Sequence, residues 1–110
     1  MLFGRRDLTG EYERLVVVQD PPSGLRAIIA IHSTARGPGF GGIRRRVYPS
    51  ETAALDEVLD LASAMSLKCA MASLPAGGAK TVILDHPELD PPAAYRALGR
   101  AIAELDGRYV

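Results

Sequence analysis

The sequence is poor in the residues that mark several common functions. Its 110 residues include no tryptophan, four tyrosines and two phenylalanines, so an aromatic platform on which nucleic-acid bases could stack is not expected. Basic and acidic residues balance at 13 each. A balanced charge gives no overall field that would attract a polyanion or a charged bilayer. We therefore expect neither nucleic acid nor a membrane among the partners.

Cysteine is almost absent as well. The single cysteine, Cys69, excludes an internal disulfide and fits a reducing compartment. It has no evident Cys or His partner, so we expect a buried thiol rather than a nucleophile. Neither His32 nor His86 has metal-ligand spacing with a partner, and no metal site is predicted. No apolar run approaches the ~20 residues of a membrane span, and the start, Met1–Asp7, lacks the apolar run of a signal peptide. These absences predict a cytoplasmic protein.

The apolar residues that are present predict a small α/β fold. A length of 110 residues indicates one domain, residues 1–110, large enough for a core of its own. The β-branched run Leu15–Val18 is apolar on both faces and predicts a buried strand, and Leu25–Ile31 predicts a second one. The turn residues of Asp20–Gly24 lie between them, so we expect an antiparallel hairpin.

Two further strands and two helices follow in the pattern. Arg44–Tyr48 predicts a more exposed strand and Thr81–Leu84 a fourth. Ser50 is the expected N-cap of the first helix, and Asp90, followed by two prolines, that of the second. Each helix has an expected buried stripe at helical spacing. In the first helix it consists of Leu55, Val58, Leu59, Ala62, Met65 and Cys69. In the second helix, which Gly107 is expected to end, it consists of Tyr95, Leu98, Ile102 and Leu105. The order predicts an α/β domain with a mixed β-sheet flanked by helices.

Two lysines and two glycine-rich segments form the candidate site. Gly37–Gly42 is a loop whose backbone can approach a ligand closely. Lys68 lies at the edge of the first helical stripe, where its amine can reach a cleft, and Lys80 follows the pair Gly77 and Gly78. A buried lysine is costly unless it is paired, and desolvation lowers its pKa toward the useful range. The combination predicts a site for a small anionic substrate.

The same residues have other interpretations. Residues 77–81 do not form a P-loop, because Ala79 and Leu74 occupy glycine positions of that motif. No G-x-G-x-x-G segment opens a helix, so no dinucleotide site is encoded. Taken alone, Lys68 also fits a surface lysine, and Lys80 a solvated residue at a strand edge. The basic run Arg44–Arg46 favours an exposed strand over a phosphate site.

Six short segments stand in a fixed order along the chain: AIIAIH (27–32), RGPGFGGIR (36–44), MSLKCA (65–70), PAGGAKT (75–81), RALGR (96–100) and GRY (107–109). With these segments the chain, from about residue 15 to residue 110, closely resembles the amino-terminal domain of the leucine, valine, phenylalanine and glutamate dehydrogenases. The closing segments resemble the leucine and valine branch most. This domain binds substrate and supplies subunit contacts in that family.

The resemblance implies oxidative deamination of an L-amino acid to a 2-oxo acid and ammonia, with NAD or NADP as cofactor. It implies that Lys68 holds the substrate α-carboxylate with help from the loop around Gly41. Lys80 is the implied catalytic residue, which activates water and stabilises the oxygen of the developing carbinolamine and needs a lowered pKa for this. The implied substrate-binding residues are Phe40, Gly41, Met65, Lys68, Gly77 and Gly78.

Phe40 bears on the choice of substrate. The glutamate enzymes carry a lysine at the matching position, where it meets the side-chain carboxylate of glutamate. An aromatic ring cannot pair with a carboxylate, and desolvating an unpaired charge is costly. We therefore expect an apolar substrate, such as leucine or valine.

The family pattern continues past residue 110 into a catalytic aspartate and a dinucleotide-binding domain. Asp85 and Asp106 do not occupy the position of that aspartate. We therefore expect the cofactor to bind outside this chain and the chain alone to be inactive. The alternative hypothesis is a stand-alone oligomerisation or ligand-binding module that keeps the fold without catalysis. The subunit contacts that the resemblance implies lead us to expect a homo-oligomer. The apolar run Val16–Val18 agrees, because an edge strand this apolar needs cover.

Overall fold

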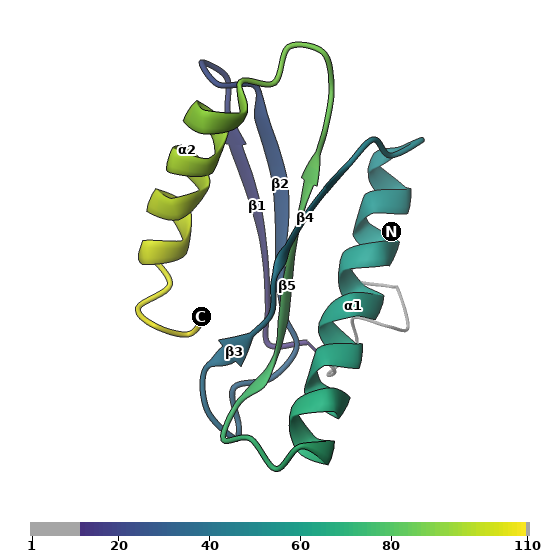
Figure 1. The fold of residues 1–110 in the computed structure, drawn as a ribbon, viewed down its shortest axis with the longest axis vertical. Coiled ribbons are helices and arrows are strands. Elements are labelled where there is room, and N and C mark those ends of the chain that lie inside the picture. The colour runs from purple at the N-terminus through teal and green to yellow at the C-terminus, as the bar shows by residue number, and fades with distance from the viewer. Residues whose placement is uncertain (1–11, 110) are drawn as a thin grey trace.

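A computed structural model describes residues 12–109. The segment Met1–Asp7, in which no signal peptide is expected, and Val110 lie outside the described residues. Figure 1 shows a β-sheet with one helix on each face. The elements are β1 (Arg14–Asp20), β2 (Leu25–Ile31), β3 (Gly39–Phe40), β4 (Ile43–Arg46), α1 (Glu51–Met71), β5 (Gly77–Leu84) and α2 (Pro91–Ala103).

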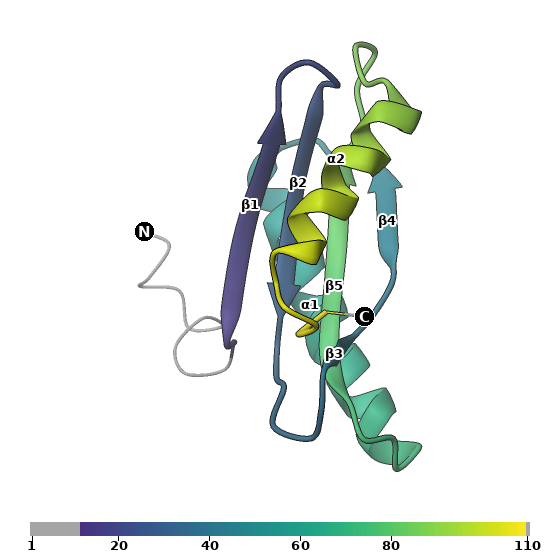
Figure 2. The ribbon, with the colours of Figure 1, turned by 90° about the vertical axis from the view of Figure 1, so that its left-hand side faces the viewer.

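The sheet is mixed, as the sequence predicts. Strand β1 pairs antiparallel with β2, and β2 pairs antiparallel with β5. The short strands β3 and β4 both run parallel to β5 on its other side. Figure 2 shows β1, β2, β5 and β4 side by side in that order. Strand β5 is therefore the element that joins the hairpin to the glycine-rich segment.

Two cores lie on the two faces of the sheet. Ile28, Ala30 and Val82 pack with α1, whereas Ile29 and Ile83 pack on the face that carries α2. Alternate residues of β2 and β5 thus point to opposite cores. This arrangement explains why both strands are apolar at almost every position, since each of their faces is covered by a helix.

Both helix starts are confirmed. The Ser50 side chain accepts a hydrogen bond from the Ala53 N–H at 3.0 Å. The Asp90 carboxylate accepts one from the Ala93 N–H at 3.5 Å. Each bond satisfies one of the amide groups that the first helical turn leaves without a backbone partner. Within residues 12–109, neither helix combines the length and apolar character needed to cross a membrane.

Three expectations about the strands and helices were wrong in detail. Strand β1 is a half-exposed edge strand rather than a buried one, and Val17 is 76% exposed. Strand β5 begins at Gly77 rather than at Thr81, because its first residues pair with β3. Helix α2 ends at Ala103 and buries Ala94, Ala97 and Leu98. Tyr95 is 41% exposed and lies under the guanidinium group of Arg45, 6.0 Å from its ring centre.

Helix α1 approaches the backbone of β5 very closely at Gly78. A Cβ atom at Gly78 would lie 2.2 Å from the Ala62 carbonyl oxygen and from the Ser66 backbone nitrogen. These are backbone atoms, which cannot rotate away as a side chain would. Only glycine fits at this crossing of helix and strand.

We expect Gly78→Ala to lower the free energy of unfolding by about 3 kcal/mol, because α1 would have to move off the strand. Gly99→Ala is the matched control, since a Cβ at Gly99 meets nothing within 4 Å. Alanine is the better helix former, so this control should raise the stability by about 1 kcal/mol. Urea unfolding measures both effects, and equal stabilities of the two variants would contradict the packing described.

His86 joins two turns at one end of the sheet. Its Nε2 lies 2.6 Å from the carbonyl oxygen of Gly24, in the turn between β1 and β2, and its Nδ1 lies 3.3 Å from the Glu88 carboxylate. The bond to the Gly24 carbonyl, followed by the bond to Glu88, raises the pKa of His86 above its usual 6.5. The protonated ring therefore stabilises the folded state.

A raised folded-state pKa has a defined consequence for stability. The contribution of His86 is fully present below the unfolded pKa of 6.5 and is lost as the pH rises through the higher folded value. We expect the free energy of unfolding to fall as the pH increases above 6.5, and His86→Gln to remove this slope. Urea unfolding over a pH series measures it, and the same slope in both proteins would exclude the assignment.

Candidate functional site

Lys80 lies on the α1 face of the sheet, beside the glycine-rich segment. In β5 it stands opposite Ala30 of β2, which belongs to the core under α1. Its side chain is half-buried. A Cβ built at Gly42 would lie 3.4 Å from the Lys80 Nζ, so the amine rests against the backbone of Gly42. The sequence distance of 38 residues between them is closed by the pairing of β4 with β5.

The glycine-rich segment lies directly on β5. Gly39 and Phe40 pair with Gly77 and Gly78. Next along the chain, a Cβ at Gly41 would lie 1.6 Å from the Ala79 carbonyl oxygen, so a side chain is excluded there. Phe40, the partner of Gly78, is 46% exposed. The ring is thus free to form part of a surface that a ligand could contact.

Ser66 fixes the turn of α1 that carries the other predicted site residues. Its hydroxyl accepts a hydrogen bond from the Gly78 N–H at 2.8 Å and lies 2.7 Å from Nδ1 of His32. Met65, which precedes it, is half-buried, whereas Lys68 is exposed. The Ser66 hydroxyl therefore links α1 to Gly78 of β5 and to His32, which follows β2. Met65 and Lys68 lie on α1 next to this link.

The predicted site residues come together only in part. Phe40, Gly41 and Lys80 lie along β5, close to Gly42, and Ser66 holds the α1 turn with Met65 and Lys68 against the same strand. Lys80 is half-buried, whereas Lys68, expected to lie partly shielded at the edge of the buried stripe of α1, is exposed.

Gly77 and Gly78 are buried, and their lack of a side chain has a packing cause. A Cβ at Gly77 would lie 1.7 Å from the Ser33 carbonyl oxygen, and one at Gly78 would overlap α1. Cys69, also buried, has its thiol 3.8 Å from the Gly77 carbonyl, which agrees with the expected structural role.

Sequence reasoning gave no role to Thr81 and Tyr109, which hold the glycine-rich segment. The Thr81 hydroxyl donates to the Tyr109 hydroxyl at 2.9 Å, and that hydroxyl donates to the Gly42 carbonyl at 2.9 Å. The pKa of the Tyr109 phenol is raised, because the effect of burial exceeds the opposite effect of the hydrogen bond from Thr81. The only signal available was the presence of both residues in the ordered segments 75–81 and 107–109.

The three arginines of β4 are engaged in ion pairs. Arg44 and Arg46 contact the Glu57 carboxylate of α1 at 3.0 and 2.7 Å, and Arg45 lies 3.7 Å from Asp85. The three arginines lie on an exposed strand, as the sequence predicts. Because they pair with carboxylates, they do not support a phosphate site. Across the part of the chain that the structure describes, no three His, Cys, Asp or Glu side chains gather as metal ligands.

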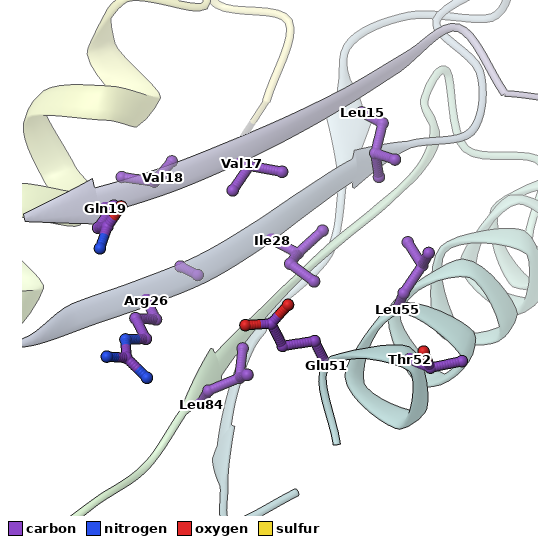
Figure 3. A pocket seen from close by; sticks show the side chains of 11 residues that line it. Leu15, Val17, Val18, Gln19, Arg26, Ile28, Glu51, Thr52, Leu55 and Leu84 are labelled. Carbon is purple, nitrogen blue, oxygen red and sulfur yellow. The ribbon is translucent and has the colours of Figure 1, made fainter. Parts of the chain in front are cut away.

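A separate groove of about 510 Å³ lies between the hairpin and the first turns of α1. Figure 3 shows its lining, which includes Leu15, Val17, Arg26, Ile28, Glu51 and Leu55. Helix α1 packs on β5 and β2, whereas Val17 of β1 remains exposed. The groove contains none of the predicted substrate-binding residues, so it is a second surface feature of the α1 face.

Comparisons with known proteins extend these observations. A family model described as "Glu/Leu/Phe/Val dehydrogenase, dimerisation domain" matches residues 12–110. The chain is 52% identical over 101 residues to leucine dehydrogenase of Bacillus cereus, covering 91% of this chain and 28% of that protein. It is 49% identical over 102 residues to valine dehydrogenase of Streptomyces coelicolor, covering 92% and 28%.

Solved structures give the same picture. L-tryptophan dehydrogenase from Nostoc punctiforme matches with a TM-score of 0.86 and 39% identity over 91% of this chain and 30% of that one. A hetero-hexameric glutamate dehydrogenase from Thermus thermophilus, in a Leu-bound form, matches with a TM-score of 0.62 and 33% identity, covering 86% and 24%. The chain thus spans less than a third of the length of these relatives.

Proposed function

We propose a function from the family to which the chain belongs, the Glu/Leu/Phe/Val dehydrogenases, whose dimerisation domain it matches. The chain is proposed to be the substrate-binding and oligomerisation part of an L-amino-acid dehydrogenase. The proposed reaction is oxidative deamination of an apolar amino acid to the 2-oxo acid and ammonia. The observation that carries the proposal is the amine of Lys80 close to Gly42, where a Cβ would lie 3.4 Å from Nζ. An amine beside a residue without a side chain leaves room for a small substrate.

Lys80 is the proposed acid–base residue. When bound, the nicotinamide would accept hydride from the substrate Cα, which leaves an imino acid. The neutral Lys80 amine takes a proton from the water that attacks the C=N carbon, and the ammonium group so formed stabilises the oxygen of the carbinolamine while the C–N bond breaks and ammonia leaves. This work needs a group that is fixed in space but accessible. Lys80 meets that need, because its backbone lies in the middle strand β5 and its half-buried side chain reaches Gly42.

Lys68 is the proposed partner of the substrate α-carboxylate, together with the backbone around Gly41. An ammonium group and a carboxylate form a charge-assisted bond. The hydrogen bond that the Ser66 hydroxyl accepts from the Gly78 N–H holds the helical turn that carries Lys68. The exposure of Lys68 suits a group that meets a ligand rather than a core residue.

Phe40 and Met65 are the proposed apolar contacts of the substrate side chain. The exposed ring of Phe40 offers no charge to a second carboxylate, which supports an apolar substrate such as leucine or valine over glutamate. Relatives named leucine and valine dehydrogenases agree with this choice. Gly77 and Gly78 are proposed to lie beneath the substrate through their backbone alone.

The nicotinamide cofactor, NAD or NADP, is proposed to bind outside this chain. The sequence has no G-x-G-x-x-G turn that opens a helix, so its own residues do not fit a dinucleotide. The chain spans only 28% of the named leucine dehydrogenase, which leaves the remaining length for that task. We therefore propose that the chain alone has no activity. A separate proposal concerns location: the free thiol of Cys69 supports a cytoplasmic protein.

Substitution of the two lysines tests the assignment in the longer protein that joins this chain to its downstream sequence. We expect Lys80→Ala to lower kcat by roughly 10³-fold, since an acid–base group is lost. Lys68→Ala should instead act mainly by raising KM, because it removes a binding charge. The measurement is NAD or NADP reduction with leucine, valine, phenylalanine and glutamate.

Arg100→Ala is the control, because Arg100 is an exposed cation on α2 and should leave both constants unchanged. Full activity of Lys80→Ala would exclude the catalytic assignment, and highest activity on glutamate would exclude the role given to Phe40. A natural gene product that ends near residue 110, and is stable and oligomeric, would favour the alternative of a stand-alone module.

A second copy of the chain is the proposed occupant of the groove beside β1. The family model names a dimerisation domain, and Val17 is 76% exposed at an edge of the sheet. Among the strands of residues 12–109, β1 pairs with β2 alone, and an apolar edge strand is a surface for pairing with another chain. Covering the groove would bury Val17 together with the half-buried Leu15, which also lines it.

We expect Val17→Asp to weaken self-association by tenfold or more, because the substitution places a charge in an apolar contact. Val47→Asp is the matched control, since Val47 is 70% exposed and follows β4 at the other edge of the sheet. Light scattering over a concentration series measures both. A wild-type chain that stays monomeric at high concentration, or a larger effect of Val47→Asp, would contradict the proposed interface.

A further inference from the structure

We propose that Tyr109 is a positioning residue that acts through Gly42 on Lys80. Its hydroxyl fixes the carbonyl group of Gly42 and thereby sets the Gly39–Gly42 segment against the Lys80 amine. The inference rests on the proposed function, because Lys80 is the group whose surroundings Tyr109 determines. Nothing in the sequence motifs assigns a task to this side chain.

The Gly42 carbonyl accepts two hydrogen bonds. One comes from the Tyr109 hydroxyl at 2.9 Å and the other from the Thr81 N–H at 3.1 Å. The Thr81 hydroxyl in turn donates to the Tyr109 oxygen at 2.9 Å, which leaves the phenolic proton directed at Gly42. Both lone pairs of the carbonyl are thus occupied, and its position is fixed from two directions.

The same stretch of chain also holds the other end of the segment. The Gly39 N–H donates to the Arg108 carbonyl at 2.6 Å, and Gly39 forms a parallel bridge with Tyr109. Between these two anchors, Gly41 lies so close to the Ala79 carbonyl that no side chain fits. The segment is therefore clamped at Gly39 and Gly42 and pressed onto β5 at Gly41.

The bond between Thr81 and Tyr109 is buried, whereas the bond from Tyr109 to Gly42 is partly buried. Thr81 is 0% exposed and Tyr109 is 7% exposed, and both lie on the α2 face, where Thr81 pairs with Ile29 and Tyr109 packs in the same core. Water cannot replace the buried bond, and removing one of its partners leaves the other unsatisfied. Burial also raises the pKa of the phenol, so the hydroxyl keeps its proton and continues to donate.

The link to Lys80 is the contact between its amine and Gly42. Because a Cβ at Gly42 would lie only 3.4 Å from the Lys80 Nζ, a small shift of Gly42 changes the surroundings of that amine directly. It also turns the backbone of Gly41, which is proposed to help hold the α-carboxylate. Small displacements of groups that align a substrate have large effects on rate.

The test compares Tyr109→Phe and Thr81→Val with the control Tyr95→Phe in the longer protein. We expect Tyr109→Phe and Thr81→Val each to lower kcat/KM about tenfold and to shift the pH profile of kcat/KM. A tenfold change corresponds to the loss of one hydrogen bond worth about 1.4 kcal/mol. Tyr95 lies exposed on α2 with its ring under Arg45, so Tyr95→Phe should change neither. Thr81→Val keeps the test decisive if Tyr109→Phe folds poorly.

Spectra of the 110-residue chain give an independent readout. The chain has two lysines, so selective ¹⁵N-lysine labelling yields one backbone amide signal for each. We expect Tyr109→Phe to shift the Lys80 signal and to leave the Lys68 signal in place. A change confined to stability, with the pH profile and the Lys80 signal unchanged, would overturn the inference.

The outcomes separate this inference from the proposed function. Loss of activity in Lys80→Ala together with unchanged kinetics in Tyr109→Phe and Thr81→Val overturns the role of Tyr109 alone. Full activity in Lys80→Ala overturns the proposed function itself, whatever Tyr109→Phe does.

Discussion

Helix α1 rests directly on the backbone of β5 at Gly78, and most of the structure depends on this contact. The missing side chain lets the Ala62 carbonyl and the Ser66 amide come within a distance that any Cβ would prevent. The Ser66 hydroxyl then bonds the Gly78 amide and lies beside His32. The crossing sets how closely the 21-residue helix approaches β5, and the core residues of α1 that pack on β2 and β5 complete its placement.

Strand β5 gathers the remaining parts of the site because it is paired on both sides. The hairpin joins it through β2, and the glycine-rich segment joins it through β3 and β4. Parallel and antiparallel neighbours on one strand bring together residues that are far apart in the sequence. The pairing of β5 therefore places the amine of Lys80, the proposed acid–base group, next to Gly42.

Local features of the structure could be predicted from the sequence, whereas features set by distant contacts could not. The hairpin and the two helix caps depend on a few neighbouring residues, such as Ser50 and Asp90. The position of the Arg45 guanidinium over the Tyr95 ring joins two distant residues, and the extension of β5 to Gly77 depends on pairing with β3. The two lysines were predicted from their motif, but Tyr109 takes its place from Thr81 and Gly42, 28 and 67 residues away.

Lys80 and Thr81 are neighbours in the chain, point to opposite faces of the sheet, and both meet Gly42. Thr81 and Tyr109 lie on the side of α2, where Tyr109 shares a core with Leu98 and Leu105. The packing beneath α2 therefore influences the surroundings of the Lys80 amine on the opposite face of the sheet, although the two faces share no side chain. Residues that never touch a substrate can adjust the site from the reverse side, and sequence change under α2 becomes one route by which related chains can differ in activity while keeping the same lysines.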